Sequence, residues 1–402
     1  MGVSDRWWAT VCARAGVAAL LASAGVAAER PSVRDAAAAV AADNIRRHTV
    51  VLGSDPLQGR APGTAGGQRA AAYIAAELER LGVVPLGENG TYFQNVPLHG
   101  NTPMDDSRLT LLSLGEQLLL ELGSDYLLYS TGSQTWIPRP APMVFVGYGI
   151  VAPEFDHNDY ADVDVRGKVV VFLGGEPPSE DPEFFAGEEP SVYSSVETKA
   201  RIALARGAVG SVVIPPTDDP GRMWSRLRTE FSFEHLTLAY TVPRHLSVVL
   251  HPRLAPRLFG DALYDFEQVR AMQHEHALRA FHLPVSLAFE GHFSSRNFLS
   301  PNVVGLLEGS HPDLKDRYVV VSAHYDHLGL GPAVADDRIY NGVVDNALGV
   351  AGVLEIARVF AERVGPPGRS IIYLFSTAEE AGNLGTAFFL DHPPVPLARI
   401  VA

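Results

Sequence analysis

The sequence predicts an α/β fold with a mostly parallel mixed sheet and helices on both faces. Near-continuous apolar strands are expected at 302–309, 318–323 and 369–377, and apolar residues at helical spacing predict a helix at 346–363. Apolar strands that alternate with helices are typical of a sheet covered on both sides. Five residues of that helix are expected to face the core: Leu348, Val353, Leu354, Ile356 and Phe360.

The N-terminal part of the chain is expected to be helical. Residues 35–52 and 66–82 are rich in alanine, and the apolar residues of the second segment line one helix face. Gly82 provides a C-terminal stop for the second helix. The segment between the helices, SDPLQGRAPGTAGG, is dense in Gly, Pro and Asp, and its local chemistry favours a connecting loop.

A β-rich segment interrupts the α/β pattern. From about residue 126 to 280 the chain shows short strands and many turns, and the segment 196–216 reads as a helix followed by a strand. We therefore expect an inserted domain at 126–280. The first part of the α/β domain is then 29–125, and the rest of it is 281–402.

Composition excludes some classes of function. The 402 residues are enough for two domains, and contents of 47% hydrophobic and 19% charged residues indicate a globular protein. The formal net charge is −14, and no run of five or more basic residues occurs. Nucleic-acid binding is therefore not expected, because it normally requires a basic face.

Residues 1–28 are expected to be an export signal. Arg6 supplies a positive start, 15–26 is a short apolar run, and 26–28 offers small residues for cleavage. The run is shorter than the ~20 residues that span a bilayer, although a membrane anchor or a buried helix is the alternative. Since Cys12 is the only cysteine, the mature protein would have no thiol. We expect a protein exported to the periplasm or the extracellular space, without stable membrane association.

Three groups of acidic and imidazole side chains stand at the ends of predicted elements. His324 and Asp326 follow one strand, Asp345 precedes the helix, and Glu379 and Glu380 follow the last strand. In open α/β sheets, ligands bind beyond the carboxyl ends of the strands. Histidine and carboxylates without thiolates suit zinc or another borderline metal ion. The sequence therefore predicts a metal site.

Each group has a possible chemical role, and each also has a simpler structural explanation. Residues two apart in an extended chain share a side, so Asp326 could hold the His324 ring from behind. Of the two adjacent glutamates, one can bind metal while the other faces the water that loses a proton. Taken singly, the His-x-Asp pair is common, Asp345 could be a helix N-cap, and a Glu pair is usually solvated. Their order at successive element ends favours the metal site.

These residues lie in motifs that resemble family 28 of the metallopeptidases, the di-zinc aminopeptidases, in the form with a protease-associated domain insert. The resemblance covers 52–96, 302–331, 339–358 and 376–390, which include the motifs SAHYDHLGLG, IYNGVVDNALGV and STAEEAGNLG. The insert is similar to protease-associated domains through DYADVDVRGKVVVFLGG and ETKARIALARGAVGSVVIPP.

The resemblance implies a role for each site residue. It implies two zinc ions, with a bridging water that attacks the peptide carbonyl and releases N-terminal residues from peptide substrates. By position, His324 matches a ligand of one zinc, Asp345 the bridging ligand, Glu380 a ligand of the other zinc, Glu379 the general base and Asp326 the residue that orients the histidine.

Residues near the ligands also match or depart from the family pattern. His327 is expected to line the pocket, and Asn346 stands where the family often has a cis peptide bond. Val344 and Leu348 replace the residues that the family usually carries, but neither is a ligand position.

The family also has an aspartate and a histidine ligand beyond the glutamate pair, and this sequence ends at Ala402. We therefore expect a fragment of a longer reading frame that is inactive by itself. There are two alternatives. One is a carboxypeptidase or glutaminyl-cyclase-like reaction on the same scaffold, and the other is a receptor-like binding protein. The preferred N-terminal residue, the oligomeric state and the task of the insert stay open.

Overall fold

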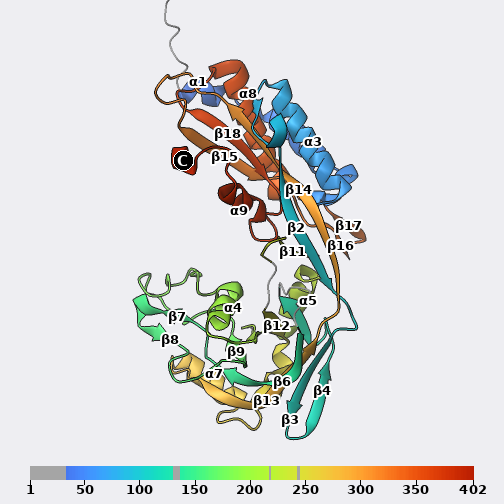
Figure 1. Cartoon of the computed structure of the whole chain (residues 1–402), viewed down its shortest axis with the longest axis vertical. Helices are drawn as coiled ribbons and strands as arrows, with labels where there is room; N and C mark the ends of the chain where they lie inside the picture. Colours follow the sequence, from blue (N-terminus) through green and yellow to red (C-terminus); the bar gives the residue numbers. More distant parts are fainter. Residues whose placement is uncertain (1–32, 130–135, 217–218, 242–244) are drawn as a thin grey trace, which may run out of the picture.

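The structure is a computed structural model that describes residues 33–129, 136–216, 219–241 and 245–402. The expected export signal lies outside these residues. Figure 1 shows two lobes, joined by the long strands β2 (Phe93–Pro103) and β14 (Phe293–Leu307). We call them the upper and the lower lobe, after their places in Figure 1.

The upper lobe contains a six-stranded mixed sheet with the order β11-β2-β14-β18-β15, and β1 pairs with β14. Its remaining strands are β1 (Val84–Pro85), β11 (His235–Leu238), β15 (Tyr318–His324) and β18 (Ser370–Ser376). The mixed α/β sheet is confirmed, but its parallel content is lower than expected. Among the described strands of this sheet, β15 and β18 form the one parallel pair.

The antiparallel pairing of β2 and β14 follows from the chain path. The chain enters the lower lobe at the end of β2 and returns at the start of β14, where Pro103 lies opposite Phe293. A chain that leaves and returns at the same place runs back beside itself. The apolar pattern of the strands contains no information on this direction, so the sequence-based expectation of a mostly parallel sheet overestimated the parallel share.

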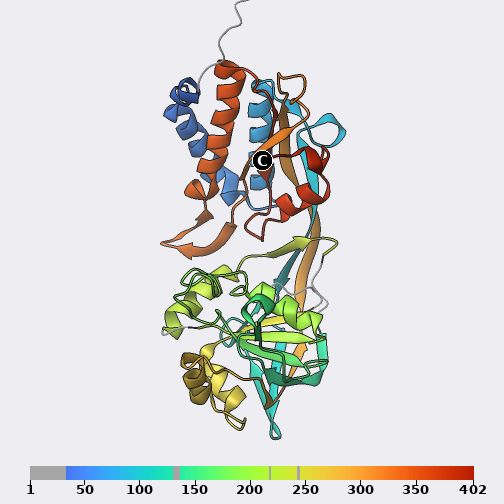
Figure 2. The ribbon, with the colours of Figure 1, turned by 90° about the vertical axis from the view of Figure 1, so that its left-hand side faces the viewer.

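Helices cover both faces of this sheet, as expected. On one face lie α2 (Ala42–Leu52), α3 (Ala65–Arg80) and α8 (Leu348–Val359), and on the other lies α9 (Leu384–Asp391) (Figure 2). Alternate residues of β18 pack to opposite sides, because successive side chains of a strand point to opposite faces. Tyr373 joins the core under the first group of helices, whereas Leu374 joins the core beside α9.

The helix expected at 346–363 is α8, followed by a wide helical turn, η6 (Phe360–Val364). Val353 and Leu354 are buried as expected, and Phe360 is partly buried. The expectation for Leu348 and Ile356 is wrong, because they are 46% and 38% exposed. The buried stripe passes instead through Val350, Val353, Leu354 and Ala357, which share the helix face that packs on α2 and the sheet.

The lower lobe contains an eight-stranded sheet with the order β4-β3-β13-β6-β9-β10-β12-β5. The strands are β3 (Arg108–Ser113), β4 (Glu116–Leu120), β5 (Tyr126–Tyr129), β6 (Trp136–Phe145), β9 (Val169–Leu173), β10 (Gly210–Ile214), β12 (Leu246–Leu250) and β13 (Phe281–Glu290). The helices are α4 (Val196–Ala205), α5 (Pro220–Glu230), α6 (Ala255–Phe259) and α7 (Phe266–His274).

This sheet extends beyond the expected insert bounds of 126–280. Strands β3 and β4 precede residue 126, and β13 follows residue 280. Conversely, β11 lies within those bounds but pairs with β2 of the upper sheet. The division into domains and the resemblance to protease-associated domains stay predictions.

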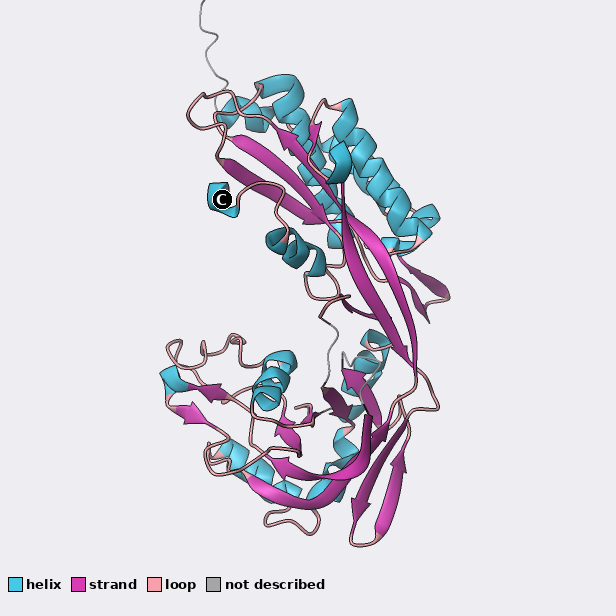
Figure 3. Cartoon of the chain, in the orientation of Figure 1, coloured by secondary structure: helices cyan, strands magenta, loops and turns pink. Residues whose placement is uncertain are grey.

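Short elements complete the described chain (Figure 3). They are α1 (Val33–Ala38), η1 (Asp55–Arg60), η2 (Glu88–Gly90), β7 (Val151–Ala152), η3 (Pro153–Phe155), β8 (His157–Asn158), η4 (Pro252–Leu254), β16 (Gly329–Val334), β17 (Asp337–Tyr340), η5 (Val343–Ala347) and η7 (Leu397–Arg399). Within the described ranges, we find no helix with the length and apolarity that a bilayer crossing requires.

Candidate metal centre

The predicted site residues emerge from one edge of the upper sheet. Strands β15 and β18 are parallel and in register, with His324 opposite Ser376. The main-chain N–H of Tyr325 donates to the Ser376 oxygen at 3.0 Å, which continues the pairing one residue further. The residues that follow both strands therefore leave the sheet side by side. This is where ligand sites lie in α/β folds, beyond the carboxyl ends of the strands.

Asp345 reaches the site from the turn η5, which precedes α8. Its backbone is not helical (φ −114°, ψ 95°), and the peptide bond to Asn346 is cis. The cap of the helix is provided by Asn346, whose Oδ1 accepts a hydrogen bond from the Gly349 N–H at 3.0 Å. Because Asn346 fills this role, the Asp345 carboxylate is available to the site.

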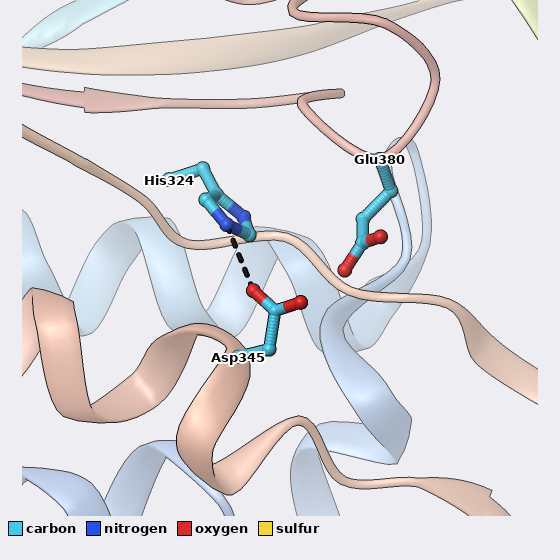
Figure 4. Close-up of side chains that lie close together, drawn as sticks. All are labelled: His324, Asp345 and Glu380. Carbon is cyan, nitrogen blue, oxygen red and sulfur yellow. Dashed lines mark ion pairs between the residues drawn. The ribbon is translucent and has the colours of Figure 1, made fainter. Parts of the chain in front are cut away.

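Three side chains come together as a candidate metal centre: His324, Asp345 and Glu380. Each offers one ligand atom, and these atoms all lie within 4.8 Å of one another. Figure 4 shows the Asp345 and Glu380 carboxylates on the same side of the His324 ring, and His324 Nε2 lies 3.0 Å from Asp345 Oδ1. One imidazole nitrogen and two carboxylate oxygens form a donor set that fits zinc.

The second glutamate lies beside this centre. Glu379 Oε2 is 3.6 Å from His324 Nε2, and the Glu379 side chain is 32% exposed, so water can reach it. His327 Nδ1 forms a short contact with Glu380 Oε1. His327 also lines the pocket next to the centre, as the sequence predicted.

Asp326 connects the two strand ends beneath the site. It is fully buried, and its Oδ1 accepts a hydrogen bond from the Glu379 N–H at 3.2 Å. His324 Nδ1 lies 3.2 Å from the main-chain oxygen of Asp326 and 3.8 Å from its carboxylate. Burial raises the pKa of the Asp326 carboxyl above its ordinary value, and the Glu379 N–H bond and His324 oppose this rise.

The second carboxylate oxygen of Asp326 has no hydrogen-bond partner among the described residues. A buried unpaired carboxylate oxygen is costly, and a cation held by the adjacent His324 would offset this cost. This oxygen and the donor set are the structural features that fit a bound metal ion.

Arg60 is the residue that the sequence reasoning missed. It lies in the segment expected to be a simple connector, yet it is 1% exposed and reaches behind the site. Its guanidinium donates to the main-chain oxygens of Leu52, Tyr325, Asn341 and Gly342 at 2.5 to 2.8 Å. No local pattern distinguishes such an arginine from a solvated one. The one sequence feature that could have pointed to Arg60 is its position as a single basic residue among residues that favour turns.

Arg60 also contributes positive charge beneath the acidic site. Burial lowers the pKa of its guanidinium to about 10, and the carboxylates of Asp326, Asp345 and Glu380 oppose that shift. Arg60 is therefore charged at neutral pH. It holds the loop after β15 and the loop before Asp345 through the same side chain, which links two of the three ligand-bearing segments.

Two curated relatives resemble short stretches of the chain. An aminopeptidase of Bacillus subtilis, YwaD, is 33% identical over 99 residues, which are 24% of this chain and 18% of that protein. A probable zinc metalloprotease of Pyricularia oryzae is 40% identical over 91 residues, 22% of this chain and 16% of that protein. The chain thus matches less than a fifth of the length of either relative.

A solved aminopeptidase of Aneurinibacillus sp. strain AM-1 has a similar arrangement over most of the chain. The similarity covers 89% of this chain and 68% of that one, with 16% identity and a TM-score of 0.49. Values this low assign no function.

The relatives correct the expected localisation. Several of them are fungal proteins named vacuolar membrane protease, at 23% to 35% identity. These names contradict the expectation of export to the periplasm or the extracellular space. The physical reason is that a short apolar leader marks entry into a membrane system, and does not specify the final compartment.

The family assignment comes from the segment that contains the whole candidate metal centre. Residues 302–402 match the description "Peptidase family M28". His324, Asp345, Glu379 and Glu380 all lie within these residues. Residues 302–402 of this chain are therefore similar to peptidase family M28.

Proposed function

We propose that the chain carries the metal-binding part of a zinc-dependent aminopeptidase, which releases N-terminal residues from peptides. The observation that carries this proposal is the grouping of His324, Asp345 and Glu380 inside the segment assigned to peptidase family M28. The aminopeptidase of B. subtilis and the zinc metalloprotease of P. oryzae support the reaction class and the metal.

In this proposal, three side chains hold metal. His324 and Glu380 would each hold one of two zinc ions, and the Asp345 carboxylate would contribute to both. Zinc, when bound, supplies a Lewis acid that polarises a peptide carbonyl and lowers the pKa of water. The exposure of the Asp345 side chain, 64%, leaves its second oxygen accessible for such sharing.

Glu379 is the proposed general base. Its carboxylate is partly exposed and adjoins the ligand cluster, so it can take a proton from the attacking water and pass it to the leaving amine. The Glu379 backbone is held by the Asp326 carboxylate through its N–H. Asp326 therefore positions the base and faces the His324 ring from behind.

Metal analysis tests the proposed ligands. The protein is dialysed against excess zinc, and bound zinc is measured by mass spectrometry alongside zinc titration of the His324→Ala and His311→Ala variants. We expect His324→Ala to weaken zinc binding at least tenfold, because the zinc ion assigned to His324 would keep only Asp345 of its two proposed ligands. His311 lies outside the cluster, so its replacement is the control. Zinc binding unaffected by the loss of His324 would refute the ligand assignment.

Cleavage of matched peptides tests the reaction. Zinc-loaded protein expressed from its full reading frame is incubated with one peptide that has a free N-terminus and with its N-acetylated copy, and the products are identified by mass spectrometry. Release of the first residue from the free peptide alone is the expected result, and Glu379→Gln is expected to lower its rate at least 100-fold. Internal cleavage of both peptides, or loss of the C-terminal residue, would exclude an aminopeptidase.

A further inference from the structure

A pocket lies beside the candidate metal centre and is lined by both lobes. Its volume is about 490 Å³. Asp326, His327 and Glu380 contribute from the upper lobe, and Tyr129 and Phe231 are among the residues that contribute from the lower-lobe segment. Because Glu380 belongs to both the cluster and the pocket wall, the pocket opens directly on the proposed reaction centre.

The wall opposite the metal ligands is aromatic. We call Tyr129, Phe231 and His235 the aromatic wall. The Phe231 ring meets Tyr129 edge to face at 5.4 Å and His235 at 5.8 Å between ring centroids. All three residues are half-buried, so they present ring surface to the pocket. Burial lowers the pKa of His235, which favours the neutral form of its ring.

The His235 end of the aromatic wall is fixed to the upper lobe. His235 begins β11, which pairs with β2, and it lies opposite Asn101. Phe233 packs on Tyr340 at 5.1 Å between ring centroids, and a Cβ at Gly331 would lie only 2.5 Å from the Phe233 ring. Although the sequence places this segment in the insert, strand pairing and ring packing hold it at the ligand-bearing lobe.

The carboxylates at the rim do not make the pocket favour a cationic side chain. Besides Glu380, three glutamates line the pocket, and each of these three has an arginine partner, which neutralises much of its charge. The pairs are Glu197–Arg201 at 2.6 Å, Glu230–Arg226 at 3.3 Å and Glu234–Arg296 at 2.5 Å.

We propose that this pocket binds a large apolar or aromatic side chain of the peptide substrate, and that the aromatic wall sets this preference. The inference rests on the proposed peptidase function and adds a substrate class to it. The volume lies in the range of pockets that take small organic groups, and aromatic rings stack favourably on such a wall. Part of the specificity would then come from the segment that the sequence assigns to the insert.

Peptide binding to the zinc-loaded protein tests this inference without requiring turnover. Calorimetric titrations compare three tripeptides that differ only in their first residue: phenylalanine, alanine or lysine. We expect the phenylalanine peptide to bind at least tenfold more tightly than the alanine peptide, since burial of a phenyl ring has about this effect. The lysine peptide should bind no more tightly than the alanine peptide.

Variants assign the preference to the wall. Phe231→Ala is expected to reduce the ratio of phenylalanine to alanine affinity to about threefold or less. Phe231→Leu keeps the core packing and should give an intermediate ratio, which guards against a folding defect in the alanine variant. Trp136 is 66% exposed and lies outside the pocket, so Trp136→Ala is the matched control and should keep the original ratio.

The outcomes separate the two proposals. If the peptides bind with equal affinity, if lysine is preferred, or if Phe231→Leu and Phe231→Ala both keep the full ratio, the inference is overturned while the peptidase proposal stands. If zinc binds and none of the peptides does, the proposed function fails, and the inference fails with it.

Discussion

Arg60 determines more of the site than its place in a turn-rich segment indicates. Its side chain donates to four main-chain oxygens that lie in segments far apart in the sequence. Two of these segments lead to the candidate metal ligands His324 and Asp345. Buried polar groups must be paired, so removal of the guanidinium leaves several oxygens without a donor at once.

Replacement of Arg60 by methionine should therefore destabilise the protein and loosen the metal site. We expect a loss of about 3–5 kcal/mol in the free energy of unfolding and at least tenfold weaker zinc binding. Urea unfolding and zinc titration measure the two effects. Arg69, an exposed arginine of the next helix with one main-chain contact, provides the control, and Arg69→Met should cost under about 0.5 kcal/mol. Equal effects of the two replacements would contradict this role.

Lys199 is a second buried basic residue, located in α4 of the lower lobe. It is fully buried, and its ammonium donates to the main-chain oxygens of Leu173, at 3.1 Å, and Gly175. Burial lowers its pKa from 10.5 to about 7, with Asp159 and Glu176 opposing the shift. Above pH 7 the native state has lost this proton, whereas the unfolded chain keeps it until about pH 10.5.

The free energy of unfolding should therefore rise with pH between about 7 and 10 because of Lys199. In this window the unfolded state binds more protons, and one group contributes at most about 1.4 kcal/mol per pH unit. Lys199→Met should remove this contribution from the slope measured by urea unfolding at several pH values. Lys315, which is exposed, is the control, and Lys315→Met should keep the slope of the unmodified protein. A slope unchanged by Lys199→Met would disprove the buried, deprotonated state.

At the scale of elements, the end of β18 is held by one asparagine of β14. Asn302 is fully buried, and its Nδ2 donates to Gln94 Oε1 at 3.0 Å and to the Gly385 oxygen at 2.8 Å. Its Oδ1 accepts from the Thr377 N–H at 3.0 Å. The segment between Thr377 and Gly385 contains both glutamates of the site, so this network sets the position of the loop that carries them.

Asn302→Leu should destabilise the upper lobe by about 2–4 kcal/mol, because three buried polar groups lose their partner. Zinc binding should weaken as well, since Glu380 is carried by the same loop. Urea unfolding and zinc titration provide the measurements. Asn95→Ala removes an exposed bond to Glu88 and should change stability by less than about 1 kcal/mol. A leucine variant as stable as the control would show that the network is dispensable.

At the scale of the whole molecule, the two lobes have separate cores. The apolar clusters of the upper lobe lie around β14, β15 and β18, whereas those of the lower lobe lie around β6, β9, β10 and β12. The β2–β14 ladder joins them (Figure 1). Separate cores joined by a ladder can unfold as separate units.

Calorimetry should therefore resolve two unfolding transitions, and zinc should raise the midpoint temperature of only one of them. At a zinc concentration 100 times its dissociation constant, the upper lobe is expected to gain about 2.7 kcal/mol. Val171 lies fully buried in the core of the lower lobe. Val171→Ala should affect only the transition of the lower lobe, whose free energy of unfolding should fall by about 2 kcal/mol. A single transition that responds to both changes would show that the lobes unfold together.

Local patterns were sufficient for many elements. The helices α2 and α3, the pair α4–β10 and the strands β15 and β18 occur where apolar spacing and turn residues predicted them. The expected helix stop at Gly82 coincides with its left-handed backbone, φ 69°. These features depend on neighbours within a few residues, so they can be read from one segment at a time.

The sequence by itself determined the α/β class, the element ends and the order of His324, Asp345 and Glu380 at those ends. Tertiary structure decided the direction of β14, the pairing of β11 with the upper sheet, the burial of Arg60 and the aromatic wall beside the centre. The physical reason is distance along the chain. Periodicity reports which side of an element is apolar, whereas these four features depend on contacts between segments that only folding brings together.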